Sequence, residues 1–263
     1  MEWFSFTTES ILGSGGDQCQ TRLLLLGVST DLASSVKHFE LRVSDAQLDA
    51  LTRYRERLAT TEHNLTSNRD RSELDRRHIL ESLAFGRLLS VRGLLSPGTR
   101  MLDVGAGGGL PGIPIKIAWP NVRVTLLESK AKKTEFMQQV IDDLHLDGAE
   151  VLEGRAETLG HHPGHRAAYD IVVARAVAPL PVLLEYTLPF LREGGSLAAI
   201  KGSSAQRELA ESKTAFAELG ARLTEAVKLD GSGTQTVLIV EQRGATPDPF
   251  PRRPGIPSKR PIM

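Results

Sequence analysis

The chain has 263 residues, and its 32 Lys and Arg balance 32 Asp and Glu, so the formal net charge is zero. With 40% apolar and 24% charged residues it can form one large folded domain, which excludes a wholly disordered protein. The single cysteine excludes an internal disulfide framework and a Cys-rich metal site, and no apolar run reaches the ~20 residues of a membrane span.

Residues 1–40 show no regular pattern, and we interpret them as a poorly ordered extension. Glycines surround Ser14, and the acids Glu2 and Glu9 occupy positions where a targeting sequence carries positive charge. We assign this segment no function, and the lack of a recognisable targeting sequence predicts a cytoplasmic protein.

Residues 41–97 are predicted to form a helical cap of two amphipathic helices. Ser44 and Gln47 have the spacing of a capping box. An amphipathic stripe at helical spacing follows them, made of Leu48, Leu51, Tyr54 and Leu58. A second helix is expected from about Ser72 to Leu89, before a turn at a Pro-Gly pair. These helices would cover one edge of a sheet.

Residues 98–243 alternate between strand and helix patterns. The predicted strands are 101–104, 122–127, 149–152, 169–174, 196–200, 221–229 and 235–241, and the predicted helices are 113–118, 132–146, 181–191 and 204–219. This alternation predicts an α/β fold with a doubly wound, mostly parallel, seven-stranded Rossmann-like sheet. A hairpin at 230–233 would add an antiparallel edge strand, and residues 244–263 form a basic, proline-rich tail.

A glycine loop follows the first strand and predicts a nucleotide-type ligand. Asp103–Gly112 reads DVGAGGGLPG, in which G-x-G-x-x-G would fit the dinucleotide of an NAD(P)-dependent enzyme. Asp103 would repel a pyrophosphate but suits an ammonium or sulfonium, and Glu128 ends the second strand where an acid accepts from ribose hydroxyls. Two acids around Gly105 and Gly107 therefore predict S-adenosylmethionine as the ligand. The alternative is a tight βα turn that binds no ligand.

Two further loops belong to the same rim of the sheet. Gly154–Glu157 follows the third strand, where an adenine is commonly held, and Ala174–Pro179 follows the fourth, where the transferable group should face its acceptor. Methyltransferases of exocyclic amines often carry an Asn/Asp-Pro-Pro-aromatic loop there, and this chain has none. A ring nitrogen such as guanine N7 has a free lone pair, so its methylation needs alignment rather than a general base.

Several motifs together resemble the RsmG family, also called GidB. They occur, in chain order, at Asn64–Thr66, His78 with Ser82, Leu102–Pro114, Leu126–Lys133, Gly154–Glu157, Ala174–Ala178 and Phe250–Pro257. The resemblance implies a class I S-adenosylmethionine-dependent methyltransferase that acts on guanine N7 in 16S rRNA of the small ribosomal subunit. We expect no membrane partner, because no apolar run is long enough for a membrane span, and we expect a monomer.

The resemblance assigns cofactor contacts residue by residue. The family positions are Gly105, Leu110, Ala156, Glu157 and Arg175, and by analogy Glu128, Ser129 and Lys130 would lie at the ribose and adenine. Arg175 is also expected to position the reacting groups. Glu81 departs from the family pattern, because an Asp is common at its place before the helix serine.

Cations at the same rim could contact RNA phosphates in this neutral protein. We predict such contacts for Arg155, Lys201, Arg252 and Arg253. The histidines at 161, 162 and 165 read as an exposed, flexible loop, and no metal site is expected. A catalytically silent RNA-binding or ribosome-assembly factor stays open as an alternative to the enzyme.

Overall fold

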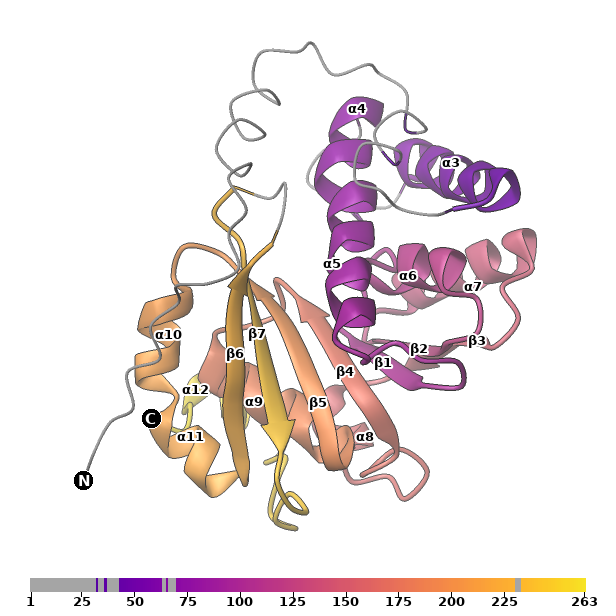
Figure 1. Ribbon diagram of the computed structural model, residues 1–263. Helices are drawn as coiled ribbons and strands as arrows, with labels where there is room; N and C mark the ends of the chain where they lie inside the picture. The colour runs from indigo at the N-terminus through magenta and orange to yellow at the C-terminus, as the bar shows by residue number, and fades with distance from the viewer. Residues whose placement is uncertain (1–31, 33–35, 37–42, 63–64, 66–69, 230–232) are drawn as a thin grey trace, which may run out of the picture.

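One seven-stranded sheet organises the molecule. The computed structural model describes residues 32, 36, 43–62, 65, 70–229 and 233–263. The strand order is β3-β2-β1-β4-β5-β7-β6, and helices cover both faces of the sheet (Figure 1). The predicted doubly wound, mostly parallel fold is confirmed. Within the described ranges, no helix has the length and apolarity that a membrane crossing requires.

Six of the seven strands match the predicted segments to within one residue at each end, whereas β5 starts five residues before the predicted segment 196–200. The strands are β1 (Arg100–Val104), β2 (Arg123–Glu128), β3 (Ala149–Glu153), β4 (Tyr169–Arg175), β5 (Leu191–Lys201), β6 (Ala221–Lys228) and β7 (Thr236–Gln242). Neighbours from β3 to β5 pair in parallel, and the order reverses between β1 and β4. A ligand of such a sheet binds at the carboxyl ends of the strands beside this switch point.

The predicted hairpin adds an antiparallel edge strand, and the structure shows that this edge strand is β6. β7 pairs antiparallel with both β5 and β6, so it lies inside the sheet and β6 forms the edge. Residues 237–240 of β7 are all buried, as in a central strand covered on both faces, whereas most of β6 is exposed or half-buried. The hairpin therefore folds back towards β5 instead of away from it.

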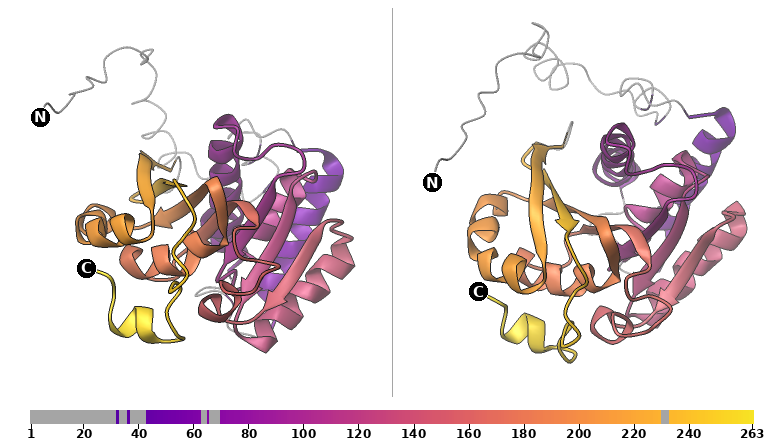
Figure 2. Two further views of the ribbon diagram at one scale, coloured as in Figure 1. Left: turned by 90° about the horizontal axis from the view of Figure 1, so that it is seen from below. Right: turned by 60° about the horizontal axis from the view of Figure 1, so that its bottom comes forward.

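Helices from the two halves of the chain divide between the faces of the sheet (Figure 1, Figure 2). One face carries α3 (Asp45–Thr60), α4 (Arg71–Leu74), the π-helix η1 (Asp75–Ile79), α5 (Leu80–Val91), α6 (Gly112–Ala118) and α7 (Ala131–Leu144). The other carries α8 (Ala156–Leu159), α9 (Leu180–Thr187), the 3-10 helix η2 (Leu188–Phe190), α10 (Ala205–Glu211) and α11 (Lys213–Glu218). Successive strand residues such as Met101 and Leu102 enter opposite core layers.

Two predicted helices are shorter than expected. The predicted helix 181–191 ends at Thr187, and η2 leads directly into β5. The predicted helix 204–219 is broken at Ser212, whose Oγ donates to the Glu208 carbonyl at 2.6 Å and separates α10 from α11. A serine that bonds the preceding turn of backbone competes with regular helix continuation.

The N-terminal helical pair forms as predicted, with one shift. The Ser44 Oγ accepts from the Gln47 amide at 3.2 Å, and the Gln47 side chain accepts from the Ser44 amide at 2.8 Å, which confirms the capping box. The second helix starts at Arg71 instead of Ser72, because the Asp70 carboxylate caps it by accepting from two backbone amides. It ends at Val91 and contains the π-helix η1.

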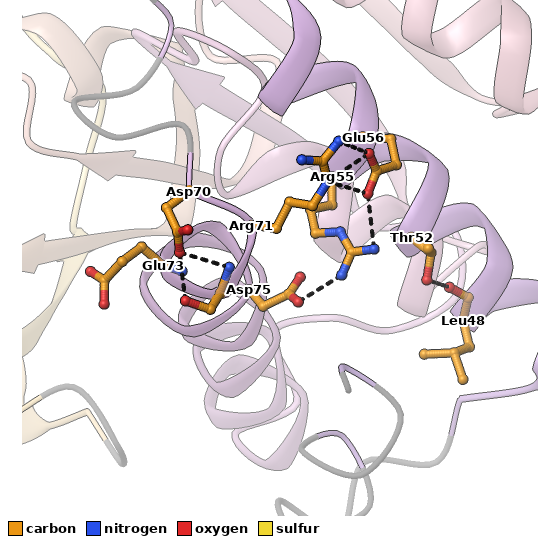
Figure 3. A network of polar contacts seen from close by, with 9 residues as sticks. Leu48, Thr52, Arg55, Glu56, Asp70, Arg71, Glu73 and Asp75 are labelled. Carbon is orange, nitrogen blue, oxygen red and sulfur yellow. Dashed lines mark hydrogen bonds and ion pairs between the residues drawn. The ribbon is translucent and has the colours of Figure 1, made fainter. Parts of the chain in front are cut away.

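Ion pairs join these two helices at their outer ends (Figure 3). Arg55 Nη1 lies 2.8 Å from Asp75 Oδ2, and Arg71 Nη2 lies 2.7 Å from Glu56 Oε2. The Arg55–Asp75 pair ties the first residue of the π-helix to α3, so this irregular turn is held against its neighbour.

The two ends of the chain relate differently to the core. Of the predicted extension at 1–40, only Leu32 and Val36 lie among the described residues, and both are buried in the core layer of α3. The tail packs on the α9 side through α12 (Ile256–Lys259), as the yellow segment in Figure 2 shows. The Arg166 guanidinium fixes the tail by donating to the backbone carbonyls of residues 246, 247 and 250, and it also donates to the carbonyl of residue 160 after α8.

Candidate functional site

The glycine loop joins β1 to α6 at the switch point of the sheet. Gly105, Gly107 and Gly109 have φ values of 72°, 62° and 95°, a left-handed region that side chains disfavour. A Cβ at Gly105 would lie 2.9 Å from Val177 Cγ2, and one at Gly109 would lie 2.3 Å from Ile113 Cδ1. The loop therefore presents backbone, and not side chains, at the carboxyl end of β1.

Asp103 lies completely buried in β1, directly before this loop. Its Oδ2 accepts from the Gly112 amide at 2.9 Å, while its Oδ1 has no partner among the described residues. Burial raises the pKa of Asp103 from 3.8 to about 7, although the Gly112 hydrogen bond and the positive charge of Arg175 oppose this rise. A cation placed beside Oδ1 would satisfy the free oxygen and favour the ionised carboxylate.

Glu128 occupies the equivalent place at the end of β2 and is 8% exposed. Its Oε2 accepts from the Gly107 amide at 3.2 Å, and its Oε1 accepts from the amides of Ser129 at 2.8 Å and Lys130 at 3.1 Å. Lys133 Nζ lies 3.8 Å from Oε2. These contacts orient the carboxylate, and Oε2, with one hydrogen bond, retains room to accept from a hydroxyl.

The two acids hold opposite ends of the glycine loop, Glu128 at Gly107 and Asp103 at Gly112. A pyrophosphate placed between them would meet two carboxylates, which disfavours a dinucleotide. A ligand with an ammonium at one end and a ribose diol at the other fits both acids. The donor and acceptor set of this chain therefore fits S-adenosylmethionine.

Helix α3 supports the loop from the N-terminal cap. The Tyr54 hydroxyl donates to the Gly108 carbonyl at 2.7 Å, and Tyr54 is fully buried, which raises the pKa of its phenol well above the usual value. A Cβ at Gly108 would contact Leu58 and Leu65. Sequence reasoning placed Tyr54 only on an apolar stripe, and a phenol among leucines was the available signal for a polar role.

Arg175 ends β4 at the same rim, but its side chain turns towards the cap. Its Nη1 donates to Glu81 Oε1 at 3.1 Å and to the Arg77 carbonyl at 3.4 Å. The other Glu81 oxygen accepts from Gln235 Nε2 at 2.8 Å. Sequence reasoning noted Glu81 only as a departure from the family pattern and missed Gln235. An acid on the buried stripe of a helix was the signal for Glu81.

The remaining predicted cofactor residues occupy the carboxyl-end rim in different ways. Leu110 is buried in the loop, Ala156 is half-buried, and Ser129 and Lys130 are exposed. Glu157 is buried, and its Oε1 accepts from the Gly255 amide at 3.0 Å. Through this oxygen the carboxylate of Glu157 holds the tail.

Two of the four predicted RNA contacts need correction. Lys201 is 8% exposed, and its Nζ lies 2.6 Å from Glu208 Oε2 and 2.8 Å from the Ala178 carbonyl. The Arg252 guanidinium makes a two-pronged ion pair with the fully buried Glu185. These cations are therefore committed to internal carboxylates, whereas the other two predicted cations, at positions 155 and 253, are exposed.

The histidine loop is more ordered by contacts than predicted. His161 Nε2 lies 2.6 Å from the Pro251 carbonyl, and His165 Nδ1 lies 3.0 Å from the Tyr169 hydroxyl. In the described part of the chain, no three His, Cys, Asp or Glu side chains gather in a way that could hold a metal ion.

Comparison with known proteins gives a consistent result. The family model described as rRNA small subunit methyltransferase G matches residues 47–237. A protein named ribosomal RNA small subunit methyltransferase G from Desulfitobacterium hafniense is 39% identical over 86% of this chain and 94% of its own length. Its namesake from Roseiflexus castenholzii is 40% identical over 85% of this chain and 95% of its own length.

Solved structures of lower identity share the fold. A mutant of MtNAS in complex with S-adenosylmethionine superposes with a TM-score of 0.54 at 15% identity, covering 81% of this chain and 77% of that one. Geranyl diphosphate C-methyltransferase from Streptomyces coelicolor gives a TM-score of 0.51 at 18% identity, covering 77% of this chain and all of that one (100%).

Proposed function

The chain belongs to the rRNA small subunit methyltransferase G family, and on that premise we propose that it methylates N7 of a guanine in 16S rRNA. The donor is S-adenosylmethionine, and the acceptor is the RNA of the small ribosomal subunit. The observation that carries the proposal is the glycine loop with one buried acid at each end, Asp103 and Glu128.

The residues of the loop divide the task of holding the cofactor. S-adenosylmethionine supplies an electrophilic methyl group on a sulfonium. Asp103 Oδ1 would accept from the ammonium of the methionine portion, and Glu128 would accept from the ribose hydroxyls. Gly105 and Gly107 would let the ligand approach the backbone, because both have a positive φ that disfavours side chains and neither carries a Cβ.

The acceptor side needs alignment and not proton removal. Guanine N7 carries a free lone pair, so the site must place it in line with the methyl group. The segment 176–179 after β4 carries no acid or amide that would engage an exocyclic amine. Arg175 ends β4 beside this segment. Because its guanidinium turns towards Glu81, we assign it to positioning the base and not to the cofactor contact that the resemblance implied.

The RNA must reach this rim with its target base unstacked, as specific recognition of RNA usually requires. Arg155 precedes α8 and Arg253 lies in the tail, and both are exposed cations suited to phosphate contacts. We also propose that the protein acts as a monomer. We place it in the cytoplasm, where its ribosomal substrate is assembled.

Methyl transfer to small-subunit RNA tests the proposal directly. Small subunits prepared without the modification are incubated with the protein and isotopically labelled S-adenosylmethionine, and the RNA is digested and mapped by mass spectrometry. The expected product is a single 7-methylguanosine. Label at another atom would refute the N7 assignment, and cofactor binding without any transfer would favour a catalytically silent RNA-binding factor.

A further inference from the structure

The Glu81 carboxylate joins the helical cap to two strands of the sheet. It lies in α5, and its two oxygens accept from Arg175 at the end of β4 and from Gln235 directly before β7. The Glu81 side chain is 8% exposed and the Arg175 side chain 15% exposed. This ion pair is therefore largely withdrawn from water, where a directed contact holds a long side chain more firmly than at an open surface.

The π-helix η1 brings a second group of the cap to the same guanidinium. The Arg77 carbonyl lies 3.4 Å from Arg175 Nη1. A π-helix widens the turn and re-aims the groups within it, which explains how a backbone carbonyl of this segment can face a strand end. The Arg55–Asp75 ion pair holds the first residue of the same turn against α3.

His78 completes this corner. Its Nδ1 is buried without a partner among the described residues. Burial and the neighbouring positive charge of Arg175 lower the pKa of His78 to about 4, so the imidazole is neutral at physiological pH. Glu81 is thus the acid in direct contact with the Arg175 guanidinium, and it faces no competing cation from His78.

We propose that Glu81 is a positioning residue that fixes the Arg175 guanidinium at the carboxyl end of β4 and so couples docking of the helical cap to methyl transfer. This inference rests on the proposed function. The proposal assigns different steps to different acids. Asp103 and Glu128 hold the glycine loop and the cofactor, whereas Glu81 acts on the side of the acceptor base. Loss of Glu81 should therefore impair transfer and leave cofactor binding intact.

The positive charge that forms on the methylated base also favours an acid at position 81. Methylation of N7 leaves a positive charge on the purine, and an uncompensated guanidinium nearby would oppose it. Paired with Glu81, Arg175 can direct the base through its N–H groups while the pair stays neutral. An amide at position 81 would keep one acceptor but would remove this compensation.

Glu81→Gln is the test variant, and Glu225→Gln is its matched control. Glu225 in β6 pairs with Arg92 at the far end of α5, so its substitution also removes one ion pair between this helix and the sheet. Turnover, the KM for RNA and the Kd for S-adenosylmethionine are measured for both variants. For Glu81→Gln we expect kcat to fall by about 10- to 100-fold, the size of loss that a misplaced group causes, with the cofactor Kd within about twofold of wild type. Glu225→Gln should keep the wild-type kcat.

A double-variant cycle decides whether Glu81 acts through Arg175. If it does, Glu81→Gln lowers turnover little further in an Arg175→Ala background, because residues that act as a unit are not additive. Glu81→Asp should recover part of the lost turnover, since it restores the charge on a shorter side chain. Unchanged kcat in Glu81→Gln, or multiplying losses in the double variant, would overturn the inference.

Two further outcomes distinguish a failure of this inference from a failure of the proposed function and from misfolding of the variant. A lack of methyl transfer by the wild-type protein in the same assay would refute the proposed function itself. If Glu81→Gln does not fold, Gln235→Leu removes the second contact of the carboxylate without leaving an unpaired charge. That variant should then lower kcat at an unchanged cofactor Kd, and a wild-type kcat would overturn the inference.

Discussion

Substituting Asp103 by Asn removes the buried acid at the end of β1 while it keeps the side-chain size and an oxygen acceptor for the Gly112 amide. In the free protein, burial raises the pKa of Asp103 from 3.8 to about 7. This difference is roughly three pKa units, and at about 1.36 kcal/mol for each unit, ionisation of the buried acid costs about 4 kcal/mol.

The sign of the effect follows from proton binding. Between its unfolded and folded pKa values, Asp103 holds its proton in the folded protein and loses it in the unfolded chain. The wild-type protein therefore loses stability as the pH rises from about 4 to 7 and has the full penalty above that range. The Asn variant has no such proton, so its free energy of unfolding lacks this contribution.

Urea unfolding of both proteins across this pH range measures the contribution. The free energy of unfolding of the wild type, relative to Asp103→Asn, should fall by about 3 kcal/mol between about pH 4.5 and pH 8. S-adenosylmethionine should stabilise the wild type more at about pH 7 than at about pH 5, because its ammonium favours the ionised acid. If the free energy of unfolding of the two proteins changed with pH in the same way, the reasoning would be refuted.

Four other substitutions probe the remaining contacts. Glu128→Gln should weaken cofactor binding about 10- to 100-fold in calorimetry, the loss expected when hydrogen bonds to a charged acceptor become neutral, and an unchanged Kd would contradict its role. Arg252→Ala should lower the free energy of unfolding by about 3–5 kcal/mol by leaving Glu185 buried and unpaired, whereas Arg253→Ala should change it by less than about 0.5 kcal/mol and weaken RNA binding. Tyr54→Phe should cost about 1–3 kcal/mol in urea unfolding because it leaves a buried carbonyl of the glycine loop unpaired, and wild-type stability would show that this bond contributes nothing.

The parts of the fold that were predictable depend on local patterns. Buried parallel strands are near-continuous apolar runs, so β1, β2 and β4 could be placed within one or two residues. The capping box at Ser44 and Gln47 is also local, because its two side chains bond backbone three residues away. The break at Ser212 was not predictable in the same way, since serine is compatible with both a continued and an interrupted helix.

Site residues were predictable where their place at the end of a strand is enough to bring their side chain to the site. Asp103 and Glu128 end adjacent parallel strands, and the structure brings both to the glycine loop as that position requires. Lys201 and Arg252 fail the same reasoning. The location of a residue on the rim does not reveal which acid its side chain meets, and Glu185 lies 67 residues before Arg252 in the chain.

The helical cap was the least predictable part of the site, because its contribution consists of single side chains contacting distant backbone or strand ends. Tyr54 reaches a glycine 54 residues further along the chain, and Glu81 reaches an arginine 94 residues further. Neither contact has a local sequence signature, so Tyr54 was interpreted only as a member of an amphipathic stripe and Glu81 only as a departure from the family pattern. An unexpected polar group on such a stripe is the usable signal, and it applied to both.

The acids of the site hold the protein's own backbone as well as offering oxygens to a ligand, and this double role governs how they must be tested. Asp103 and Glu128 each accept from a glycine-loop amide, so truncation to Ala would release the loop and abolish binding for a reason unrelated to charge. The amide variants keep an oxygen acceptor for those bonds and change chiefly the charge. If cofactor recognition depends on negative charge at both ends of the loop, each amide variant alone must lose affinity while the loop still forms, and Tyr54 should remain protected against solvent in both.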